Sequence, residues 1–357
     1  MYANKSIKPR VLVIHTGGTI GMQPSENGYT SVDGFEELVR EKLDQSVHDT
    51  LPEFDLVELD PLLDSANLSP ESWSTIASKV IEHYAQYDGF IVLHGTDTMA
   101  YSASALSFQL RGLSKPVIVT GSQIPLYELR NDALDNLITA LIIAGFHPVP
   151  EVCIYFNGRL LRGNRSRKIK ATGLDAFDSP NYPWLGQVGI HIELHSGLIR
   201  PAGTPQLAAA NYQPGAVAML PIYPGLPQSV IKATLTDKQI RGVIIQSYGV
   251  GNLPNHDKEL MKLLEGAGKA GKVLVNLSSC LQAQVLHGTY ATSAGLDKIG
   301  IVSGGNMTPE AAYSKLHTLL ANSTNSEHVT ALMQQDLCGE LDQSSTSSSH
   351  SASSGSI

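Results

Sequence analysis

The sequence predicts an α/β fold, in which a larger N-terminal domain with a doubly wound, mostly parallel sheet precedes a smaller C-terminal α/β domain. Short β-branched runs alternate along the chain with helical patterns, as a series of βαβ units requires. Several of these runs are continuously apolar, which is typical of parallel strands covered by helices on both faces. The length of 357 residues is also sufficient for two domains.

The expected elements follow from local patterns. Strands are predicted, in chain order, at 10–16, 55–60, 89–94, 116–121, 151–156, 242–247, 272–277 and 298–303. A helix is predicted over 70–87, because its apolar residues follow i, i+3, i+4 spacing after a capping Ser69 and Pro70. The stretch 129–144 shows the same spacing, and Thr308-Pro309-Glu310 opens another helix by the same pattern of cap and proline.

Composition along the chain indicates where the domains meet. The regular alternation fails between about 191 and 225, where proline and glycine are dense. We therefore expect an N-terminal domain over 1–195, a linker over 196–225 and a C-terminal domain over 226–342. Nine of the fourteen residues from Ser344 onward are serine, which predicts a disordered tail over 343–357.

Overall composition excludes several classes of protein. A hydrophobic share of 42% excludes disorder for most of the chain, and a net charge of −8 disfavours binding to nucleic acids or anionic membranes. No stretch approaches the roughly 18 apolar residues of a membrane span, and the apolar run 11–14 is too short for a signal peptide. Three scattered cysteines without a Cys-x-x-Cys spacing indicate no zinc or redox site. The chain is expected to be soluble and cytoplasmic.

The residues able to do chemistry come directly after predicted strands. Four such strand ends carry glycines and hydroxyl or amide side chains: Thr16–Gly21, His94–Thr98, Thr120–Ser122 and Gln246–Asn252. In open α/β sheets ligands bind beyond the carboxyl ends of the strands. Glycines let backbone N–H groups approach a ligand, and hydroxyls can act as nucleophiles. Hydroxyls without thiol or metal ligands suggest acyl or amide chemistry.

Other motifs are weaker. Gly17-Gly18-x-x-Gly21 lacks the spacing of a dinucleotide-binding loop, and no P-loop or G-x-S-x-G nucleophile elbow occurs. His191 and His195 resemble a metal pair, but on a strand their rings would lie about 13 Å apart, too far for one ion. The basic stretch 159–170 is typical of a solvated face unless other evidence assigns a role to one of its members.

Two threonines could each supply a nucleophilic hydroxyl. Thr19 has the backbone N–H groups around Gly17 and Gly18 to receive developing negative charge. Thr96 has Asp97 beside it and needs a base, for which Lys168, in a cationic neighbourhood, is the obvious candidate. Spacing alone leaves open that these are turn residues at strand ends that cap helices.

A family resemblance helps to decide whether these threonines are catalytic or only turn residues. Thr16-Gly17-Gly18-Thr19-Ile20-Gly21 together with His94-Gly95-Thr96-Asp97-Thr98 resembles the paired signature of the bacterial L-asparaginases, most closely the cytoplasmic type I branch. The resemblance covers Arg10 to about Leu341, and its further matches are Asp64-Ser65, Val119-Thr120-Gly121-Ser122-Gln123-Ile124-Pro125, Arg162-Gly163-Asn164-Arg165 and Ser247-Tyr248-Gly249-Val250-Gly251-Asn252.

The resemblance implies hydrolysis of L-asparagine to L-aspartate and ammonia, without metal or cofactor. By the same resemblance, the N-terminal domain is the catalytic one and Thr19 is the primary nucleophile on a mobile loop. Tyr29 is the tyrosine that closes over it, and Thr96, Asp97 and Lys168 form the second catalytic group.

The resemblance also implies how the substrate is held. Asp64, Ser65 and Ala66 form the loop for the α-carboxylate and α-amine, with Asp97 pairing the ammonium. Many relatives carry a polar residue and then an acid after the serine, whereas Ala66 and Asn67 follow here. In the family the 248–252 segment reaches the neighbouring subunit's site, so a homodimer or homotetramer (a dimer of dimers) is expected. Asn252 then bonds the α-ammonium, or else is only a turn residue after Gly251.

Two competing functions stay open at this point. One is the related subunit of the amidotransferase that acts on glutamate-charged transfer RNA, which carries an extra N-terminal domain, whereas nine residues precede the first predicted strand here. The other is a non-catalytic doubly wound module that binds a nucleotide or an amino acid, which would need neither Lys168 nor paired hydroxyls. The expected partner is L-asparagine, with no nucleic acid and no membrane.

Overall fold

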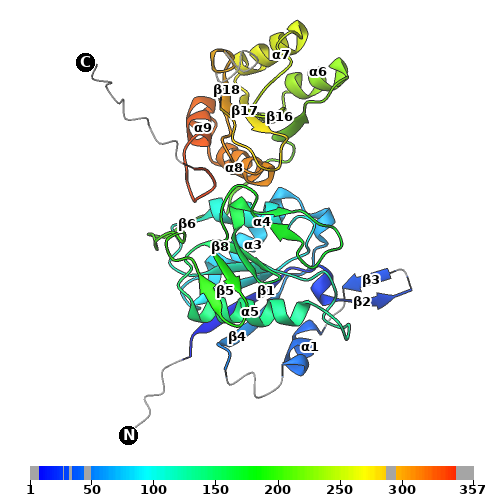
Figure 1. The fold of residues 1–357 in the computed structure, drawn as a ribbon, viewed down its shortest axis with the longest axis vertical. Helices are drawn as coiled ribbons and strands as arrows, with labels where there is room; N and C mark the ends of the chain where they lie inside the picture. Colours follow the sequence, from blue (N-terminus) through cyan, green and yellow to red (C-terminus); the bar gives the residue numbers. More distant parts are fainter. Residues whose placement is uncertain (1–7, 27, 32–33, 44–49, 287–294, 343–357) are drawn as a thin grey trace, which may run out of the picture.

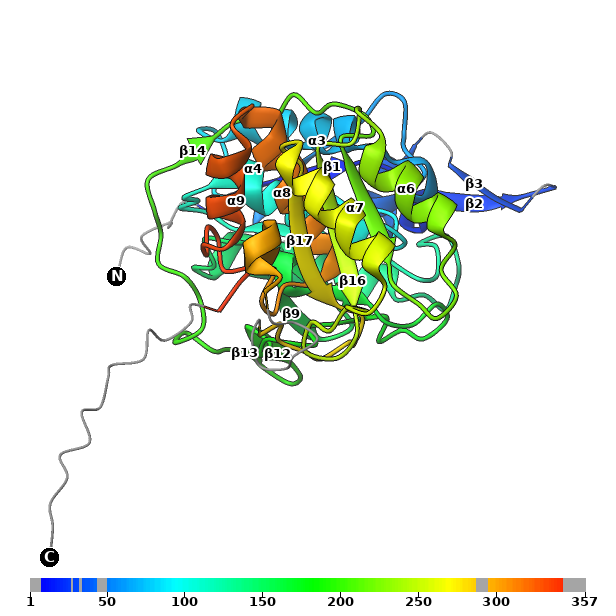
Figure 2. The ribbon, with the colours of Figure 1, turned by 90° about the horizontal axis from the view of Figure 1, so that it is seen from above.

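In the computed structural model the chain forms two α/β domains, one stacked on the other (Figure 1). The structure describes residues 8–26, 28–31, 34–43, 50–286 and 295–342, so the predicted tail over 343–357 lies outside the described residues. A hairpin of β2 (Met22–Ser25) and β3 (Gly28–Ser31) projects from the side of the N-terminal domain (Figures 1 and 2). No helix in the described ranges has the length and apolarity to cross a membrane. The predicted fold class is confirmed.

The N-terminal domain is built on an eight-stranded sheet. Five neighbouring strands run parallel, and three more continue the sheet in antiparallel pairs. The order across the sheet is β13 (Ile192–Leu194), β12 (Gly186–Val188), β9 (Arg159–Arg162), β8 (Val152–Phe156), β7 (Val117–Thr120), β5 (Gly89–Leu93), β1 (Arg10–His15) and β4 (Glu53–Glu58).

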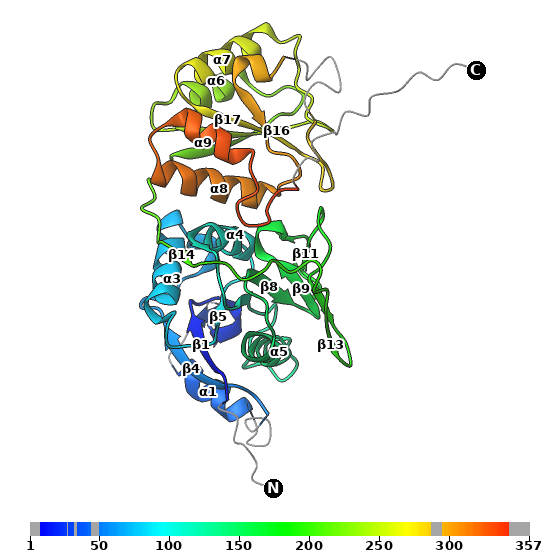
Figure 3. The same ribbon diagram turned by 90° about the vertical axis from the view of Figure 1, so that its left-hand side faces the viewer.

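Helices cover both faces of this sheet (Figure 3). Alternate residues of β1 point to opposite faces, so Leu12 and Ile14 pack with one set of helices and Val11 and Val13 with the other. The first set comprises α3 (Pro70–His83) and α4 (Met99–Gln109), and the second α1 (Phe35–Lys42) and α5 (Ala133–Phe146). Burial on both faces explains why these strands are continuously apolar.

The sheet changes winding direction between β1 and β5. The chain goes from β1 outward to β4, then crosses back to β5 on the other side of β1 and continues to β7 and β8. This is a topological switch point, where ligands bind in open α/β sheets. The ends of the two strands are tied together, because the backbone N–H and the hydroxyl of Thr16 both donate to the carbonyl of Leu93, at 3.0 and 2.8 Å.

The C-terminal domain has a four-stranded parallel sheet of β15 (Val217–Pro221), β16 (Gly242–Ser247), β17 (Val273–Ser278) and β18 (Ile301–Ser303). One face carries α6 (Gln228–Thr236) and α7 (Lys258–Lys269), and the other carries α8 (Pro309–Asn322) and α9 (Ser326–Met333). Helix α8 faces the N-terminal domain and packs on α4 (Figure 3), where the Ser314 hydroxyl donates to the Tyr101 carbonyl at 3.1 Å.

Several element boundaries differ from those expected. The helix predicted over 129–144 begins at Ala133, because the Asn131 side chain accepts the N–H groups of Ala133 and Leu134 and so caps the helix. The helix predicted over 70–87 ends at His83, and the strand predicted at 298–303 begins at Ile301 after a 3₁₀ turn. The expected linker over 196–225 contains β14 (Gln206–Leu207) and β15, so the second sheet begins at Val217.

Three of the histidines that the structure describes are buried inside the two domains. Burial lowers the pKa of His15, of His94 and of His317 from 6.5 to about 4 in each case. The His15 ring stacks on Phe35, and the His317 ring lies among the aromatic rings of α3 and its neighbours, 5.3 Å from that of Tyr313. All three are therefore neutral in the folded protein at pH 7.

These histidines predict a loss of stability in mild acid. Between pH 6.5 and about 4 the unfolded chain binds protons that the folded protein excludes. The contribution of these histidines to the free energy of unfolding is therefore fully present above pH 6.5 and is lost as the pH falls toward 4. Each histidine contributes on the order of 3 kcal/mol across this window. In His317→Phe, which keeps an aromatic ring, the decrease of Tm from pH 7 to pH 5 should be smaller. The exposed His191→Gln should match the wild type, and an unchanged pH dependence in His317→Phe would contradict this explanation.

Candidate active site

Three loops meet where β1, β4 and β5 end. Gly17 and Gly18 have φ of 117° and 88°, a region that favours glycine, and they lie against the other two loops. A Cβ atom on Gly17 would lie 2.2 Å from the Leu63 carbonyl oxygen, and one on Gly18 would lie 2.4 Å from the Gly95 Cα. A Cβ atom on Gly95 would in turn lie 2.4 Å from the Ser65 hydroxyl. The two threonine-bearing loops are therefore in direct backbone contact.

Thr19 opens the 3₁₀ turn η1 (Thr19–Gly21) at the end of β1, at the base of the β2–β3 hairpin. Its side chain is partly buried, and within the described part of the chain its hydroxyl makes no hydrogen bond. The turn is held from the far side by Leu126, whose N–H donates to the Ile20 carbonyl at 3.1 Å. The backbone at Thr19 is thus held by hydrogen bonds, whereas its hydroxyl bonds no residue that the structure describes.

Thr96 lies in a hydrogen-bonded cluster with a lysine and a carboxylate. Lys168 Nζ donates to Thr96 Oγ1 at 2.8 Å and to Asp97 Oδ1 at 2.7 Å. The side chain of Lys168 is 18% exposed and that of Asp97 is 64% exposed, so the amine is sheltered while the carboxylate faces outward. The Thr96 hydroxyl donates to Gln123 Oε1 at 3.3 Å, which leaves an oxygen lone pair directed at Lys168. The structure thus brings Lys168 to Thr96 and Asp97, from which it lies 72 and 71 residues away in sequence.

Asp64, Ser65 and Ala66 form the loop after β4. The Asp64 carboxylate caps the short turn η2 (Ser65–Asn67) by accepting the Ala66 N–H at 3.1 Å and the Asn67 side-chain amide at 3.3 Å. Ser65 is buried, whereas Asp64 and Ala66 are exposed. The Thr98 hydroxyl donates to the Ser65 carbonyl at 2.8 Å, which joins this loop to the one that carries Thr96.

Tyr29 lies on the projecting hairpin and is half exposed, at 52%. Its hydroxyl donates to Glu128 Oε1 at 2.8 Å, and this hydrogen bond raises the pKa of Tyr29. The structure therefore pairs Tyr29 with Glu128 in the loop after β7, and strands β2 and β3 project from the body of the domain (Figure 2).

Asn252 lies in the loop after β16 of the C-terminal sheet, whereas the other candidates belong to the N-terminal domain. Its backbone forms an isolated bridge with Tyr248, with N–H to carbonyl distances of 3.0 and 2.8 Å. Gly251 has a φ of 111°, and the buried Asn276 side chain donates to its carbonyl at 2.9 Å. The loop is therefore well fixed, but in the C-terminal domain of this chain, apart from the loops that follow β1, β4 and β5.

Two site residues were missing from the candidates. Gln123 accepts from the Thr96 hydroxyl and also donates to the carbonyls of Ala171 and Gly173, both at 3.0 Å, so it fixes the loop beyond Lys168. Glu128 is the partner of Tyr29. Both follow β7. Gln123 lies within the 119–125 segment that resembles the family, whereas the only signal for Glu128 is its place after a strand end.

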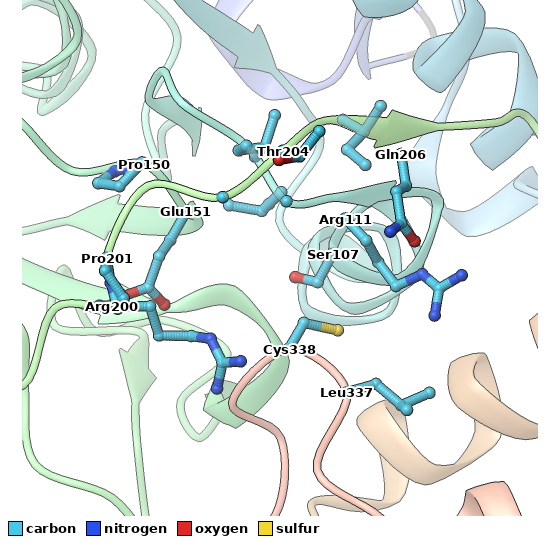
Figure 4. A pocket seen from close by; sticks show the side chains of 15 residues that line it. Ser107, Arg111, Pro150, Glu151, Arg200, Pro201, Thr204, Gln206, Leu337 and Cys338 are labelled. Carbon is cyan, nitrogen blue, oxygen red and sulfur yellow. The ribbon is translucent and has the colours of Figure 1, made fainter.

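A cavity between the two domains lies elsewhere. It has a volume of about 430 Å³ and is lined by residues of both domains (Figure 4). Arg200 and Glu151 lie in its wall and are engaged in ion pairs, Arg200 with Asp336 at 2.8 Å and Glu151 with Arg162 at 2.5 Å. Neither threonine nor Lys168 lines this cavity, so it is separate from the candidate active site.

The chain is similar to known proteins along most of its length. Residues 10–200 match the family described as "Asparaginase, N-terminal", and residues 216–333 match "Glutaminase/Asparaginase C-terminal domain". The chain is 45% identical to L-asparaginase 1 of Escherichia coli (strain K12), with 94% of this chain and 98% of that protein covered. It is 39% identical to the 60 kDa lysophospholipase of Mus musculus, with 93% of this chain but 62% of that protein covered.

A solved structure agrees with these relationships. The crystal structure of L-asparaginase I from Vibrio cholerae O1 biovar eltor matches with a TM-score of 0.86 at 42% identity, covering 94% of this chain and 100% of that chain. Sequence and fold point to the same relatives over both domains. The chain therefore belongs to the asparaginase family.

Proposed function

We propose how this chain hydrolyses L-asparagine to L-aspartate and ammonia: Thr19 is the nucleophile, and Thr96, Lys168 and Asp97 provide the proton transfer. The observation that carries the proposal is the 2.8 Å contact between Lys168 Nζ and Thr96 Oγ1, beside the point where the two threonine-bearing loops touch. A hydroxyl becomes an effective nucleophile or proton relay only when a base lies within hydrogen-bond distance.

In the proposed reaction the Thr19 oxygen attacks the side-chain amide carbon of asparagine. The C–N bond breaks, the nitrogen takes up the proton and leaves as ammonia, and an aspartyl ester remains on Thr19. Water then adds to the ester carbon, L-aspartate leaves and the Thr19 hydroxyl is restored. Lys168, as the neutral amine, accepts the proton that Thr96 relays from the attacking group. Backbone N–H groups around Gly17 and Gly18 stabilise the oxyanion.

Substrate binding is assigned to the loops that adjoin the threonines. The Asp97 carboxylate is exposed and pairs the α-ammonium group, while Asp64, Ser65 and Ala66 hold the α-amine and α-carboxylate. The support is that Thr98 and Gly95 connect this loop directly to the one with Thr96. In this proposal Tyr29 exchanges its bond to Glu128 for a position over Thr19 when substrate is bound.

Release of ammonia from L-asparagine, measured in a coupled assay, tests the activity. A chain that binds asparagine without releasing ammonia would be a binding module, and one that releases ammonia only with a partner protein and charged transfer RNA would be an amidotransferase subunit. Parallel assays with L-glutamine measure how far Ala66 and Asn67 affect the choice of substrate. A cytoplasmic location is part of the same proposal, and cell fractionation tests it.

We further propose a homo-oligomer, at least a dimer, in which Asn252 of one subunit completes the site of another. The support is that the Tyr248–Asn252 loop is held by its own backbone bridge and by Asn276, and lies at a strand end of the second domain, while the threonines lie on the first. In a two-fold dimer each site is then built from both chains.

Mixing two inactive variants tests this shared site. Thr19→Ala and Asn252→Ala chains are each expected to be nearly inactive. After subunit exchange about half of the dimers are mixed, and each holds one intact site, so activity should recover to about a quarter of wild type. Exchange is checked by native mass spectrometry. Confirmed exchange without recovery would exclude a site shared between subunits.

A further inference from the structure

The strand that carries Lys168 also contacts the second domain. Strand β10 consists of Arg167 and Lys168, and successive residues of a strand point to opposite sides. Lys168 reaches Thr96 and Asp97 on one side. Arg167 Nε reaches Glu310 Oε1 of the C-terminal domain, at 3.1 Å. The residue next to the proposed base is therefore an ion-pair partner of the other domain.

Glu310 lies in a buried position at the start of α8. It follows Thr308, whose side chain caps the helix by accepting the Ala311 N–H, and Pro309 at the first helical position. The Glu310 side chain is 9% exposed and that of Arg167 is 28% exposed. Burial raises the pKa of the Glu310 carboxyl, and the Arg167 charge opposes that rise. Removing one partner of such a pair leaves the other charge without compensation, so the pair resists separation.

Strand β10 is held near the Thr96 loop by α4 and by Gln123, which bonds Thr96 and donates to the carbonyls of Ala171 and Gly173, as well as by this ion pair. It pairs with β11 (Phe177–Asp178) in a two-stranded sheet of its own, separate from the eight-stranded sheet. The Thr96 loop leads directly into α4, and α8 packs on α4 near its start, where the rings of Tyr101 and Tyr313 lie 5.9 Å apart. Through Glu310, β10 is thus fastened to a helix that is itself packed on the Thr96 side of the site.

We propose that Arg167 and Glu310 are positioning residues, whose ion pair fixes β10 against α8 and thereby holds the Lys168 amine at hydrogen-bond distance from Thr96. This inference rests on the proposed role of Lys168. It gives the C-terminal domain a part in proton transfer within its own chain, in addition to the part proposed for Asn252 in a neighbouring subunit.

The test uses Arg167→Met, Glu310→Gln and the double variant in the full-length protein. Displacement of a catalytic group by about 1 Å can cost on the order of a hundredfold in rate, so we expect kcat to fall about tenfold to a hundredfold. KM should stay within about threefold, because neither side chain lies in the substrate loop. The double variant should be no slower than the single variants, since all three break the same pair. Arg167→Lys should recover part of kcat by keeping the charge.

A matched control separates positioning from general stability. Arg200→Met breaks another ion pair between an arginine and the C-terminal domain, that with Asp336, and should lower Tm without lowering kcat. Glu310→Gln keeps the shape of the side chain and removes a buried charge, so it should fold, which circular dichroism and Tm verify. Normal kcat in Arg167→Met and Glu310→Gln, with an inactive Lys168→Met, would overturn the positioning role alone. Normal kcat in Lys168→Met would overturn both that role and the proposed base.

Discussion

Replacement of Thr19 by alanine is expected to lower kcat for asparagine hydrolysis at least about a hundredfold, a typical cost of losing a nucleophile. The loss should be confined to chemistry. Thr19 is only partly buried, and its hydroxyl bonds none of the residues that the structure describes, so the substitution removes no internal hydrogen bond there. Tm should therefore equal that of the wild type. Steady-state ammonia release and thermal unfolding measure the two quantities.

The serine variant is the matched control for this experiment. Thr19→Ser keeps the hydroxyl and should retain far more activity than Thr19→Ala. Hydroxylamine offered during turnover should intercept the aspartyl ester of the wild type as a hydroxamate, and Thr19→Ala should form none. Near-normal turnover in Thr19→Ala would remove Thr19 from the mechanism and leave Thr96 as the candidate nucleophile.

Replacement of Lys168 by methionine should produce a loss of similar size. Methionine keeps the length and most of the packing of the side chain but cannot accept a proton, and it removes the 2.8 and 2.7 Å bonds to Thr96 and Asp97. General-base catalysis typically contributes about a hundredfold to ten-thousandfold in rate, so kcat should fall by at least about a hundredfold. Ammonia release under saturating asparagine measures this effect.

The neighbouring Lys170 gives the control. It is two residues away, half exposed and paired with Asp175, so Lys170→Met should keep kcat. In Lys168→Ala, where space is left beside Thr96, small alkylamines added to the buffer should restore part of the activity if the amine acts as a base. Full activity in Lys168→Met would show that Lys168 has no catalytic role and is only part of the solvated basic stretch 159–170.

Local sequence patterns predicted much of the fold and the core of the site. The long central strands and the helix that starts at Pro70 have strong periodicity and capping signals, and they lie within a few residues of their predicted places. Because these strands are parallel, their ends fall on one edge of the sheet, so Thr19 and Thr96 could be expected near one another. The contact of Lys168 with Thr96 was likewise anticipated through the base that Thr96 needs, whereas the ion pair of Lys168 with Asp97 was not.

Features that depend on tertiary contact could not be predicted in this way. Strands β10 and β11 are two residues long and show no periodicity, so nothing local marks Arg167 as a contact of the second domain. Gln123 lies in the 119–125 segment that resembles the family, but its bonds to Thr96 and to the loop beyond Lys168 depend on tertiary structure. The strand at Val217 was hidden by the proline and glycine around it.

The contact between glycine-bearing loops limits how the proposed active site can diverge. Gly17, Gly18 and Gly95 leave no room for even a methyl group, since an added Cβ would lie 2.2 to 2.4 Å from atoms of the neighbouring loops. Random mutagenesis at these positions should therefore return inactive clones almost without exception, although each keeps every reacting group. In the proposed site, exposed residues such as Ala66 have room for a larger side chain, so a change of substrate is expected at this loop rather than at the glycines.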